Sequence, residues 1–376
     1  MSGLEIVDRR EHLEPLIERW RELAVRQGNV FLTPDWYLAW LDHYPGEPAV
    51  IVIETAGGRL EGLLPLLAEP GGRLRFGGAR AGDMFEPVSR PGDEVAVARA
   101  CGGALARLTA NRTLVLDNVR RDGGWPLALV RSSQARLSAR AHREATLPWI
   151  DLRPFDTWDA FLASKSRNLR SQLRRYHRSI ERDHELGFRR SEDFATLESD
   201  VDLFFALHDA RWDKRGGSSS AGDPIRGFHR SFARAALAQG WLRLWFLELD
   251  GEPIAAWYGW LVGGRYAYYL AGFDPASAQR HPGLVLLGHT IRSAIEEGAI
   301  EYDMLLGDEH YKSRLASSER RVHTVLVTRR HSLRAAVAAG EARAWRTAQK
   351  IEPERRRRLR RALEGTLELL PGSRSR

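Results

Sequence analysis

Turns that contain glycine separate short apolar runs twice along this chain of 376 residues, and this repeat restricts the folds that the chain can adopt. Gly58 and Gly251 are 193 residues apart, and Gly72 and Gly264 are 192 residues apart. Glycine favours tight turns between antiparallel strands because it accepts positive φ angles. Strand pairs that recur at a nearly constant spacing predict two copies of one structural unit.

Each copy is predicted to be an α+β layer unit: two helices, three antiparallel strands, and then a helix, a strand, a helix and a strand. The elements expected in the first copy are helices at 13–24 and from Pro34, strands at 50–54, 60–67 and 74–78, a helix at 94–109, a strand at 113–119, a helix at 126–136 and a strand at 147–152. Those expected in the second copy are helices at 194–211 and 227–239, strands at 242–249, 253–261 and 265–272, a helix at 283–297, a strand at 300–305, a helix at 308–315 and a strand at 323–329. Thr33 is predicted to cap the helix that begins at Pro34. The predicted parts are 1–152, 153–330 and an arginine-rich helical tail at 331–376.

Composition and motif searches exclude several classes of protein. The single cysteine, Cys101, excludes a disulfide framework, a four-thiolate zinc site and an iron–sulfur cluster. No apolar run approaches the roughly 20 residues of a transmembrane helix, and charged residues occupy 8–11, where a signal peptide would begin its apolar core. No zinc-binding His-Glu-x-x-His spacing, phosphate-binding Gly-Lys loop, Gly-x-Ser-x-Gly elbow or dinucleotide fingerprint occurs. We therefore expect a cytoplasmic protein without a metal ion.

The net charge of +8 comes from two segments. Residues 329–376 contain 14 basic and 5 acidic residues, and residues 164–190 contain 9 basic and 3 acidic residues. Arginine supplies 53 of the 57 basic residues, and this bias makes arginine-rich runs weak evidence for nucleic-acid binding. The helix predicted at 164–182 carries one stripe of arginines: Arg167, Arg170, Arg174 and Arg178. Such a stripe is typical of a solvated face, or of a surface for an acidic acceptor or RNA.

Several short motifs resemble one known family. The second copy contains Gly272-Phe273-Asp274-Pro275, Pro282-Gly283-Leu284 and the run Asp-Met-Leu-Leu-Gly-Asp-Glu-His-Tyr-Lys at 303–312, and the first contains Phe-Leu-Thr-Pro-Asp-Trp at 31–36. With these motifs the chain resembles the GNAT acyltransferases, the tandem FemAB-like group among them, and within that group the cellulose-biosynthesis (CelD-type) branch. The resemblance covers about residues 5–330 and implies a tandem GNAT-like fold.

The resemblance implies that acyl-CoA is the cosubstrate and that its diphosphate binds at the start of the helix predicted at 283–297. The family pattern there is Arg or Gln, two residues, Gly, one residue, and Gly or Ala. Arg280 and Gly283 match this pattern, whereas Val285 replaces the small third residue. Backbone N–H groups and the positive end of a helix favour a diphosphate whatever side chains point away. The candidate acyl-CoA residues are Arg280, Gly283, Leu284 and Val285.

Tyr311 lies where the resemblance implies a tyrosine that protonates the departing CoA thiolate. Asp308 and Asp303 are further catalytic candidates, because an amine must lose a proton before it attacks a thioester. Asp308 is also suited to cap the following helix, and the residues leave open whether Asp303, Asp308 or a water relay is the base.

Candidate substrate-binding residues surround this segment in the sequence. Arg211 and Lys214 precede a Gly/Ser-rich stretch at 216–222, which is typical of a substrate lid or of a plain linker between helices. Asp274 follows a strand, and Lys312 could pair with Asp308, Asp303 or a phosphate. Tyr269 is also a candidate, although the aromatics of this strand, Tyr268 included, equally suit a core.

The function implied is acyl transfer from acetyl-CoA or another acyl-CoA to an amine or hydroxyl acceptor, linked to polysaccharide or cell-envelope metabolism. The acceptor would be a small molecule or a cell-envelope component. The first copy is expected to be degenerate, because its Arg90-Pro91-Gly92 turn lacks the later acidic-Tyr-Lys run. Two alternatives stay open: a FemAB-type transferase that takes its acyl group from aminoacyl-tRNA, and an inert tandem binding module.

The C-terminal tail combines leucine and arginine in a helical pattern. Its leucines, at 359, 363, 367 and 370, follow a run of four arginines at 355–358. A cationic amphipathic helix of this kind suits peripheral contact with an anionic membrane. The alternative is that the leucines pack on the protein and the arginines remain in water.

Overall fold

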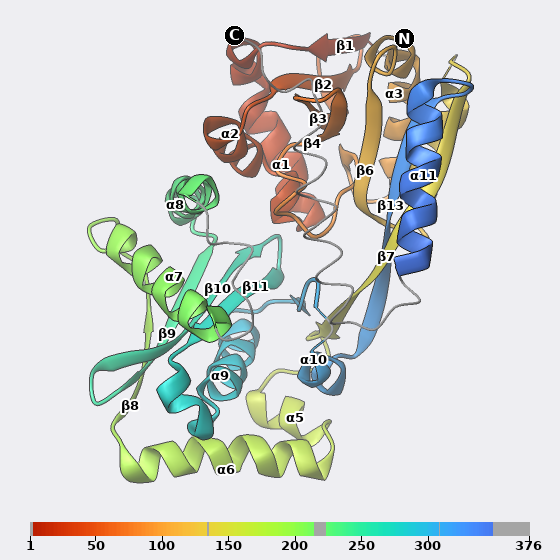
Figure 1. Ribbon diagram of the computed structural model, residues 1–376. Coiled ribbons are helices and arrows are strands. Elements are labelled where there is room, and N and C mark those ends of the chain that lie inside the picture. The colour runs from red at the N-terminus through yellow and green to blue at the C-terminus, as the bar shows by residue number, and fades with distance from the viewer. Residues whose placement is uncertain (1–2, 134, 214–222, 308, 349–376) are drawn as a thin grey trace. The chain divides into compact units, whose positions relative to one another are not determined.

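The computed structural model describes residues 3–133, 135–213, 223–307 and 309–348 (Figure 1). The described chain forms two compact units. Unit 1 comprises residues 3–27, 31–145 and 321–348, and unit 2 comprises residues 28–30 and 146–320.

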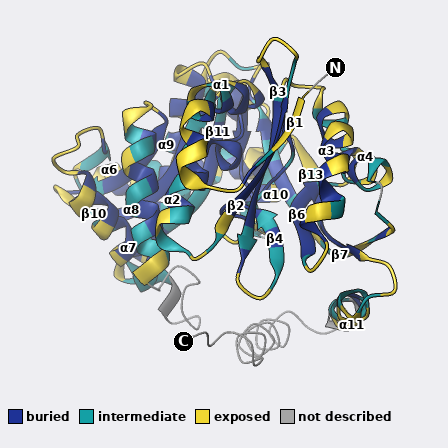
Figure 2. Ribbon diagram, turned by 90° about the horizontal axis from the view of Figure 1, so that it is seen from above, coloured by how far each residue is buried: buried dark blue, intermediate teal, exposed yellow. Residues whose placement is uncertain are grey.

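Unit 1 contains a mixed sheet whose strands follow the order β1-β2-β3-β4-β6-β13, with β7 next to β13 and β5 paired to β3. The strands are β1 (Gly3–Val7), β2 (Glu47–Glu54), β3 (Leu60–Glu69), β4 (Arg73–Phe76), β5 (Val88–Ser89), β6 (Thr113–Arg120), β7 (Leu137–Asp151) and β13 (Ser318–Arg329). The helices are η1 (Arg10–Leu16), α1 (Ile17–Gln27), α2 (Pro34–His43), α3 (Glu94–Leu108), α4 (Trp125–Ser132) and α11 (Leu333–Ala348), with the short η2 (Val30–Leu32) before α2. β2 and β3 are buried along most of their length (Figure 2). β4 and β6 pair in parallel, through Arg73 with Thr113 and Leu74 with Leu114.

Unit 2 repeats this topology. Its sheet order is β7-β12-β11-β10-β9-β8. The strands besides β7 are β8 (Leu186–Arg190), β9 (Leu242–Leu249), β10 (Glu252–Val262), β11 (Arg265–Phe273) and β12 (Glu301–Asp303). The helices are α5 (Trp158–Ala163), α6 (Arg167–Asp183), α7 (Leu197–Asp213), α8 (Asp223–Ala238), η3 (Pro275–Arg280), α9 (Pro282–Glu296) and α10 (His310–Leu315). β11 and β12 are the parallel pair, as β4 and β6 are in unit 1, so the predicted duplication is present in the fold.

The two units exchange their last strands. The strand predicted at 147–152 closes the first copy in chain order, but residues 149–151 of β7 pair with β12 in unit 2. The strand predicted at 323–329 closes the second copy, but β13 pairs with β6 in unit 1. The predicted boundaries after residues 152 and 330 follow chain order and do not describe this exchange.

Local capping rules explain why α2 begins at Pro34. Thr33 precedes α2, and its Oγ1 accepts a hydrogen bond of 3.2 Å from the Trp36 N–H, while Pro34 occupies the first turn. The cap satisfies a backbone donor that the helix leaves unpaired, and proline has no N–H to lose there. The predicted capping role of Thr33 is confirmed.

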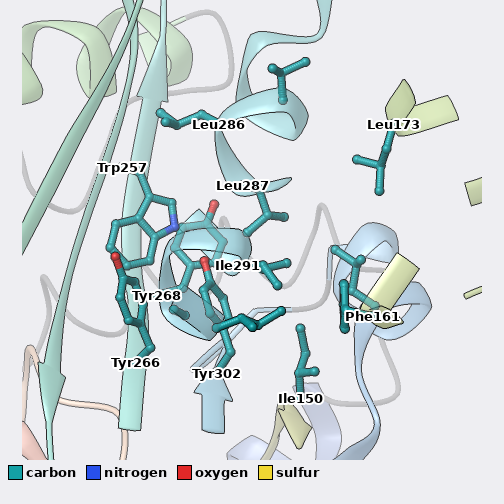
Figure 3. Packing of buried hydrophobic residues seen from close by; sticks show 14 of the residues in the cluster. Ile150, Phe161, Leu173, Trp257, Tyr266, Tyr268, Leu286, Leu287, Ile291 and Tyr302 are labelled. Carbon is teal, nitrogen blue, oxygen red and sulfur yellow. The ribbon is translucent and has the colours of Figure 1, made fainter. Parts of the chain in front are cut away.

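Alternation along the strands of unit 2 separates two apolar faces. Trp257 and Tyr266 point to the face covered by α9, where they meet Leu287 and Ile291 (Figure 3). Tyr258 points to the opposite face and contacts Phe204 of α7 at a ring-centroid distance of 5.2 Å. Successive strand residues face opposite sides, so each face of the sheet needs its own helical cover.

Burial of His229 on α8 predicts acid sensitivity of the fold. Its ring lies among Phe205, Phe228 and Tyr258, and burial lowers its pKa from 6.5 to about 3, with a smaller contribution from His208. Below pH 6.5 this histidine therefore binds a proton in the unfolded chain, whereas in the folded chain it stays neutral down to about pH 3. The free energy of unfolding consequently decreases as the pH falls from 6.5 to 3. At pH 5 the loss from this residue is about 2 kcal/mol relative to pH 7.5.

Urea unfolding at pH 7.5 and pH 5.0 measures this loss. His229→Phe is expected to reduce the difference between the two pH values by about 2 kcal/mol, whereas replacement of the exposed His12 by asparagine leaves it unchanged. An equal difference in all three proteins would show that other groups control the acid response.

The described part of the predicted tail is α11, which packs on unit 1. Ala338 contacts Val115 and Leu326, and Glu341 pairs with Arg73 at 2.8 Å. None of the described helices is long and apolar enough to cross a membrane. The leucines and arginines at 355–370 lie outside the described residues, so the membrane contact expected for them stays a prediction.

Candidate functional site

The parallel strands β11 and β12 part at the place where the predicted site residues occur. Their pairing covers only 265–267 with 301–303, while β11 continues to Phe273. After β11 the chain forms η3 and α9, and after β12 it forms a loop, described at 304–307 and 309, and then α10. Because the carboxyl ends of adjacent parallel strands meet at one edge of a sheet, both candidate segments lie at that edge.

The start of α9 offers fewer free amides than the sequence predicts. His281 adopts a left-handed conformation with φ at 54°, and its carbonyl accepts hydrogen bonds from Leu284 N (3.0 Å) and Val285 N (3.3 Å). The Val285 side chain is buried in the core of unit 2. Leu284 and Val285 are therefore occupied by local structure, and Gly283 remains the candidate amide nearest the helix end.

Arg280 and Gly283 suit an anion at this position. The positive charge of Arg280 acts on Asp183, whose pKa it helps to lower, and it would attract an anion in the same way. A Cβ on Gly283 would lie 3.6 Å from Phe273 Cδ1, and the residue is only half-buried. Both features agree with the predicted approach of a diphosphate to this turn.

Helix α6 adds an aromatic and cationic border that the sequence analysis missed. The Tyr176 ring stacks on His281 at 4.0 Å between centroids, and its hydroxyl accepts a 3.1 Å hydrogen bond from Gln172. That bond, and then Arg175 and Arg314, lower the pKa of Tyr176. α6 was predicted only from its arginine stripe, and no local signal marks Tyr176 as a neighbour of residue 281.

The arginine stripe of α6 makes mainly local contacts. Arg170 donates to the Ala163 carbonyl, Arg174 lies 3.7 Å from Asp159, and Arg178 donates to the Arg174 carbonyl. The opposite face of the helix buries Leu169 and Leu173 in the core of unit 2. The stripe is therefore the outer face of a helix that its leucines fix in place.

Tyr311 points its hydroxyl at Tyr268 of β11. The two phenolic oxygens are 3.0 Å apart, and Tyr268 in turn stacks on Trp257 (Figure 3). Burial raises the pKa of Tyr311 well above its usual value, and the neighbouring carboxylate of Glu309 raises it further. Tyr311 is thus a protonated phenol at neutral pH, as an acid must be.

Lys312 holds the loop between β12 and α10. Its Nζ donates to the carbonyls of Met304 (2.9 Å) and Leu306 (2.8 Å) and lies 3.3 Å from Glu309 Oε2. The side chain is only 5% exposed. These contacts satisfy the ammonium group within the fold, and the contact of Lys312 with substrate stays a prediction.

Asp303 fixes the same loop from its other end. One oxygen accepts the Leu305 N–H at 2.9 Å and the other pairs with Arg320 at 3.2 Å. Burial raises the pKa of Asp303, and Arg320 opposes that rise. The backbone of Leu305 is left-handed with φ at 53°, a conformation that an L-residue keeps only when its surroundings hold it. The contacts of Asp303 support a structural role, and its role as a base stays a prediction.

The remaining candidates differ in where they lie. Arg211 on α7 lies over the Phe273 ring at 5.2 Å and donates to the Ala271 carbonyl, so it reaches the end of β11. Asp274 caps η3 by accepting the Ala276 N–H at 2.9 Å. Tyr269 lies on the other face of the sheet from Tyr268. Asp308 and Lys214 are outside the described residues.

Tyr269 shares its face with α8 and not with Tyr311. Its ring is 5.0 Å from that of Trp260 and 5.5 Å from that of His229. Across the described residues, no group of three His, Cys, Asp or Glu side chains is arranged to hold a metal ion.

Comparisons with known proteins agree with this architecture. Residues 167–313 match the family model of the acetyltransferase (GNAT) domain. The structure of FemX matches with a TM-score of 0.62 and 12% identity over 86% of this chain and 98% of FemX. L-PGS from Bacillus licheniformis matches with a TM-score of 0.55 and 13% identity over 92% of this chain and 99% of that chain. A tandem GNAT protein from the clavulanic acid biosynthesis pathway matches at 15% identity with a TM-score of 0.46, over 87% of this chain and 98% of its own. No curated protein sequence matches the chain.

The predicted fold class is confirmed: the chain has an α+β, tandem GNAT-like fold. The matched segment runs from α6 into α10 and contains the whole edge at which β11 and β12 part. Unit 1 repeats the strand order of that segment. The CelD-type branch is not addressed by these matches and stays a prediction.

Proposed function

We propose that unit 2 transfers an acyl group from acyl-CoA to an amine or hydroxyl acceptor. One observation carries this proposal: two features lie at the edge where the parallel strands β11 and β12 part. The first is the start of α9, where Arg280 and Gly283 suit an anion, and the second is Tyr311, a buried and protonated phenol. The helix start suits the diphosphate of CoA, and the phenol suits the sulfur that leaves.

The reaction follows directly from these groups. The acceptor nitrogen or oxygen attacks the thioester carbonyl carbon, the carbon–sulfur bond then breaks, and an amide or ester remains. Tyr311 gives its proton to the departing sulfur, and the proton lost by the acceptor passes to water. A backbone N–H of a strand would hold the oxygen of the tetrahedral intermediate.

Two other functions remain as alternatives. The arginine face of α6 beside the start of α9 favours an aminoacyl-tRNA donor as the second candidate, because such a face attracts a polyanion. An inert binding module is the third. The acceptor class proposed from the sequence, a polysaccharide or cell-envelope component, rests on resemblance alone.

One pair of measurements separates these functions. We expect acetyl-CoA to raise the unfolding temperature of the full chain and, with an amine panel that includes amino sugars, to release free thiol. Stabilisation by aminoacyl-tRNA but not by acyl-CoA would favour the second candidate. Stabilisation by acyl-CoA without any thiol release would favour an inert module.

Replacing Tyr311 with phenylalanine is expected to lower the rate of thiol release about 10- to 100-fold. A thiol pKa near 8.5 already makes thiolate a good leaving group, so a general acid contributes less here than to a poorer one. The dissociation constant for acetyl-CoA should change less than 2-fold, because the lost interaction is made mainly in the transition state. Steady-state rates and calorimetric binding measure the two quantities, and full retention of rate would reduce Tyr311 to a packing residue.

A further inference from the structure

We propose that Tyr268 is the positioning residue for Tyr311, donating its hydroxyl hydrogen to the Tyr311 oxygen so that the Tyr311 proton faces the leaving sulfur. This inference rests on the function proposed above. The resemblance assigns no role to Tyr268, and its sequence context suits a core aromatic.

The position of Tyr268 is fixed by its packing. Its ring stacks on Trp257 with a centroid distance of 5.5 Å and an interplanar angle of 19°. The ammonium of Lys312 lies over the ring, 5.4 Å from its centroid. Tyr268 itself is 7% exposed, so its ring cannot swing away from the site. Its hydroxyl is thereby held 3.0 Å from that of Tyr311.

The chemistry of Tyr311 requires such a partner. When Tyr311 gives its proton to sulfur, it becomes a phenolate in a buried place, where charge is costly. A hydrogen bond donated by Tyr268 stabilises that phenolate more than it stabilises the neutral phenol, and so makes Tyr311 a stronger acid. Solvent water then returns a proton to Tyr311. No proton leaves Tyr268 in this sequence.

Other charged groups near Tyr311 have contacts of their own. Lys312 donates to two carbonyls of the loop between β12 and α10, and Arg211 contacts Phe273 and the Ala271 carbonyl. Glu309 is acidic and opposes the phenolate. Tyr268 is the hydroxyl in direct contact with Tyr311, and only one of the two hydroxyls can donate to the other.

The opposite direction of that hydrogen bond gives the opposite result. If Tyr311 donated to Tyr268, and the Tyr268 hydrogen stayed directed elsewhere after ionisation, the Tyr311 proton would be turned away from the sulfur. Tyr268 would then hold that proton on Tyr311, and removal of the Tyr268 hydroxyl would lower the pKa of Tyr311 or leave it unchanged. Tyr268→Phe keeps the ring on Trp257 and removes only the hydroxyl, so it distinguishes the two directions.

The first test needs no enzymatic activity. Tyr311 is replaced by 3,5-difluorotyrosine, whose phenol is more acidic than that of tyrosine and therefore ionises at a lower pH in the same site, and this ionisation is followed by ultraviolet absorbance. We expect Tyr268→Phe to raise the pKa of residue 311 by about one. Tyr269→Phe is the matched control, because Tyr269 lies on the other face of the sheet with Trp260 and His229, and no change is expected from it. An unchanged or lowered pKa in Tyr268→Phe would overturn the proposal.

The second test uses thiol release from acetyl-CoA with water or an amine as acceptor. Tyr268→Phe is expected to lower kcat about 10-fold with KM for acetyl-CoA unchanged, and to lower it no further in a protein that also carries Tyr311→Phe. Independent losses that multiply in the double variant would overturn the proposal. If the unmodified protein releases no thiol, the proposed function fails, while the titration still decides whether Tyr268 donates to residue 311.

Discussion

Replacing Gly283 with aspartate is expected to weaken acetyl-CoA binding at least 100-fold while the protein remains folded. The new carboxylate would lie at the start of α9, where the diphosphate is proposed to bind. At an effective dielectric constant of 20, two like charges about 5 Å apart repel by roughly 3 kcal/mol, which corresponds to more than 100-fold in affinity. The Cβ that any substitution adds meets only Phe273 at 3.6 Å, an ordinary contact, so the backbone tolerates it.

Two matched variants isolate the charge in this experiment. Gly283→Ala adds the Cβ alone and is expected to change affinity only slightly, and Gly283→Asn adds the same bulk as aspartate without its charge. Calorimetric titration with acetyl-CoA measures all three, and thermal unfolding confirms that each is folded. Equal affinity in the aspartate and asparagine variants would show that the diphosphate does not bind at this turn.

Sequence patterns located most elements of both units because these elements bury one face. The alternation around Trp257 and Tyr258 predicted β10, and the cap at Thr33 predicted α2. β7 was predicted to begin at residue 147, but it begins at Leu137. The sequence did not predict this first part because residues 138–146 are mostly exposed or half-buried and show no apolar period. Its place beside β13 defines the strand, and β13 begins 181 residues after β7 begins.

The exchange of strands could not be read from chain order. β7 and β13 occupy equivalent positions in the two repeats, and either could close either sheet by its own composition. Which sheet each strand closes depends on contacts between residues far apart in sequence, such as Asp303 with Trp149 and Val325 with Leu116. A pattern within one segment contains no information about such pairs.

The sequence predicted which motif residues lie at the site, but it did not predict which of them hold the loop in place. Arg280, Gly283 and Tyr311 lie at the edge that the resemblance implied. Asp303 and Lys312 were predicted to act on substrate, which stays a prediction, and their hydrogen bonds hold the loop that precedes Tyr311. Their spacing suited both roles, and only the positions of the backbone carbonyls and of Leu305 distinguish them.

Gly272→Ala is expected to destabilise the protein by about 3 kcal/mol or more. Gly272 lies on β11 under α7, and an added Cβ would overlap the backbone of Leu207 and His208. Backbone atoms cannot rotate away as a side chain can, so the whole helix would have to move outward. That movement would also break two contacts with the Ala271 carbonyl, from His208 Nδ1 at 3.0 Å and from Arg211 at 3.3 Å.

Gly288→Ala is the matched control for this substitution. Gly288 lies in α9 of the same unit, and a Cβ there would make ordinary contacts of 3.6–3.8 Å with Trp158 and Leu173. Alanine stabilises a helix interior relative to glycine by about 0.5–1 kcal/mol, so this variant should unfold at a higher urea concentration than the unmodified protein. Urea unfolding therefore gives shifts of opposite sign for two glycine-to-alanine changes. If Gly272→Ala unfolded at the same urea concentration as the unmodified protein, α7 would not lie as close to β11 as described, and Arg211 would lose its support at the end of that strand.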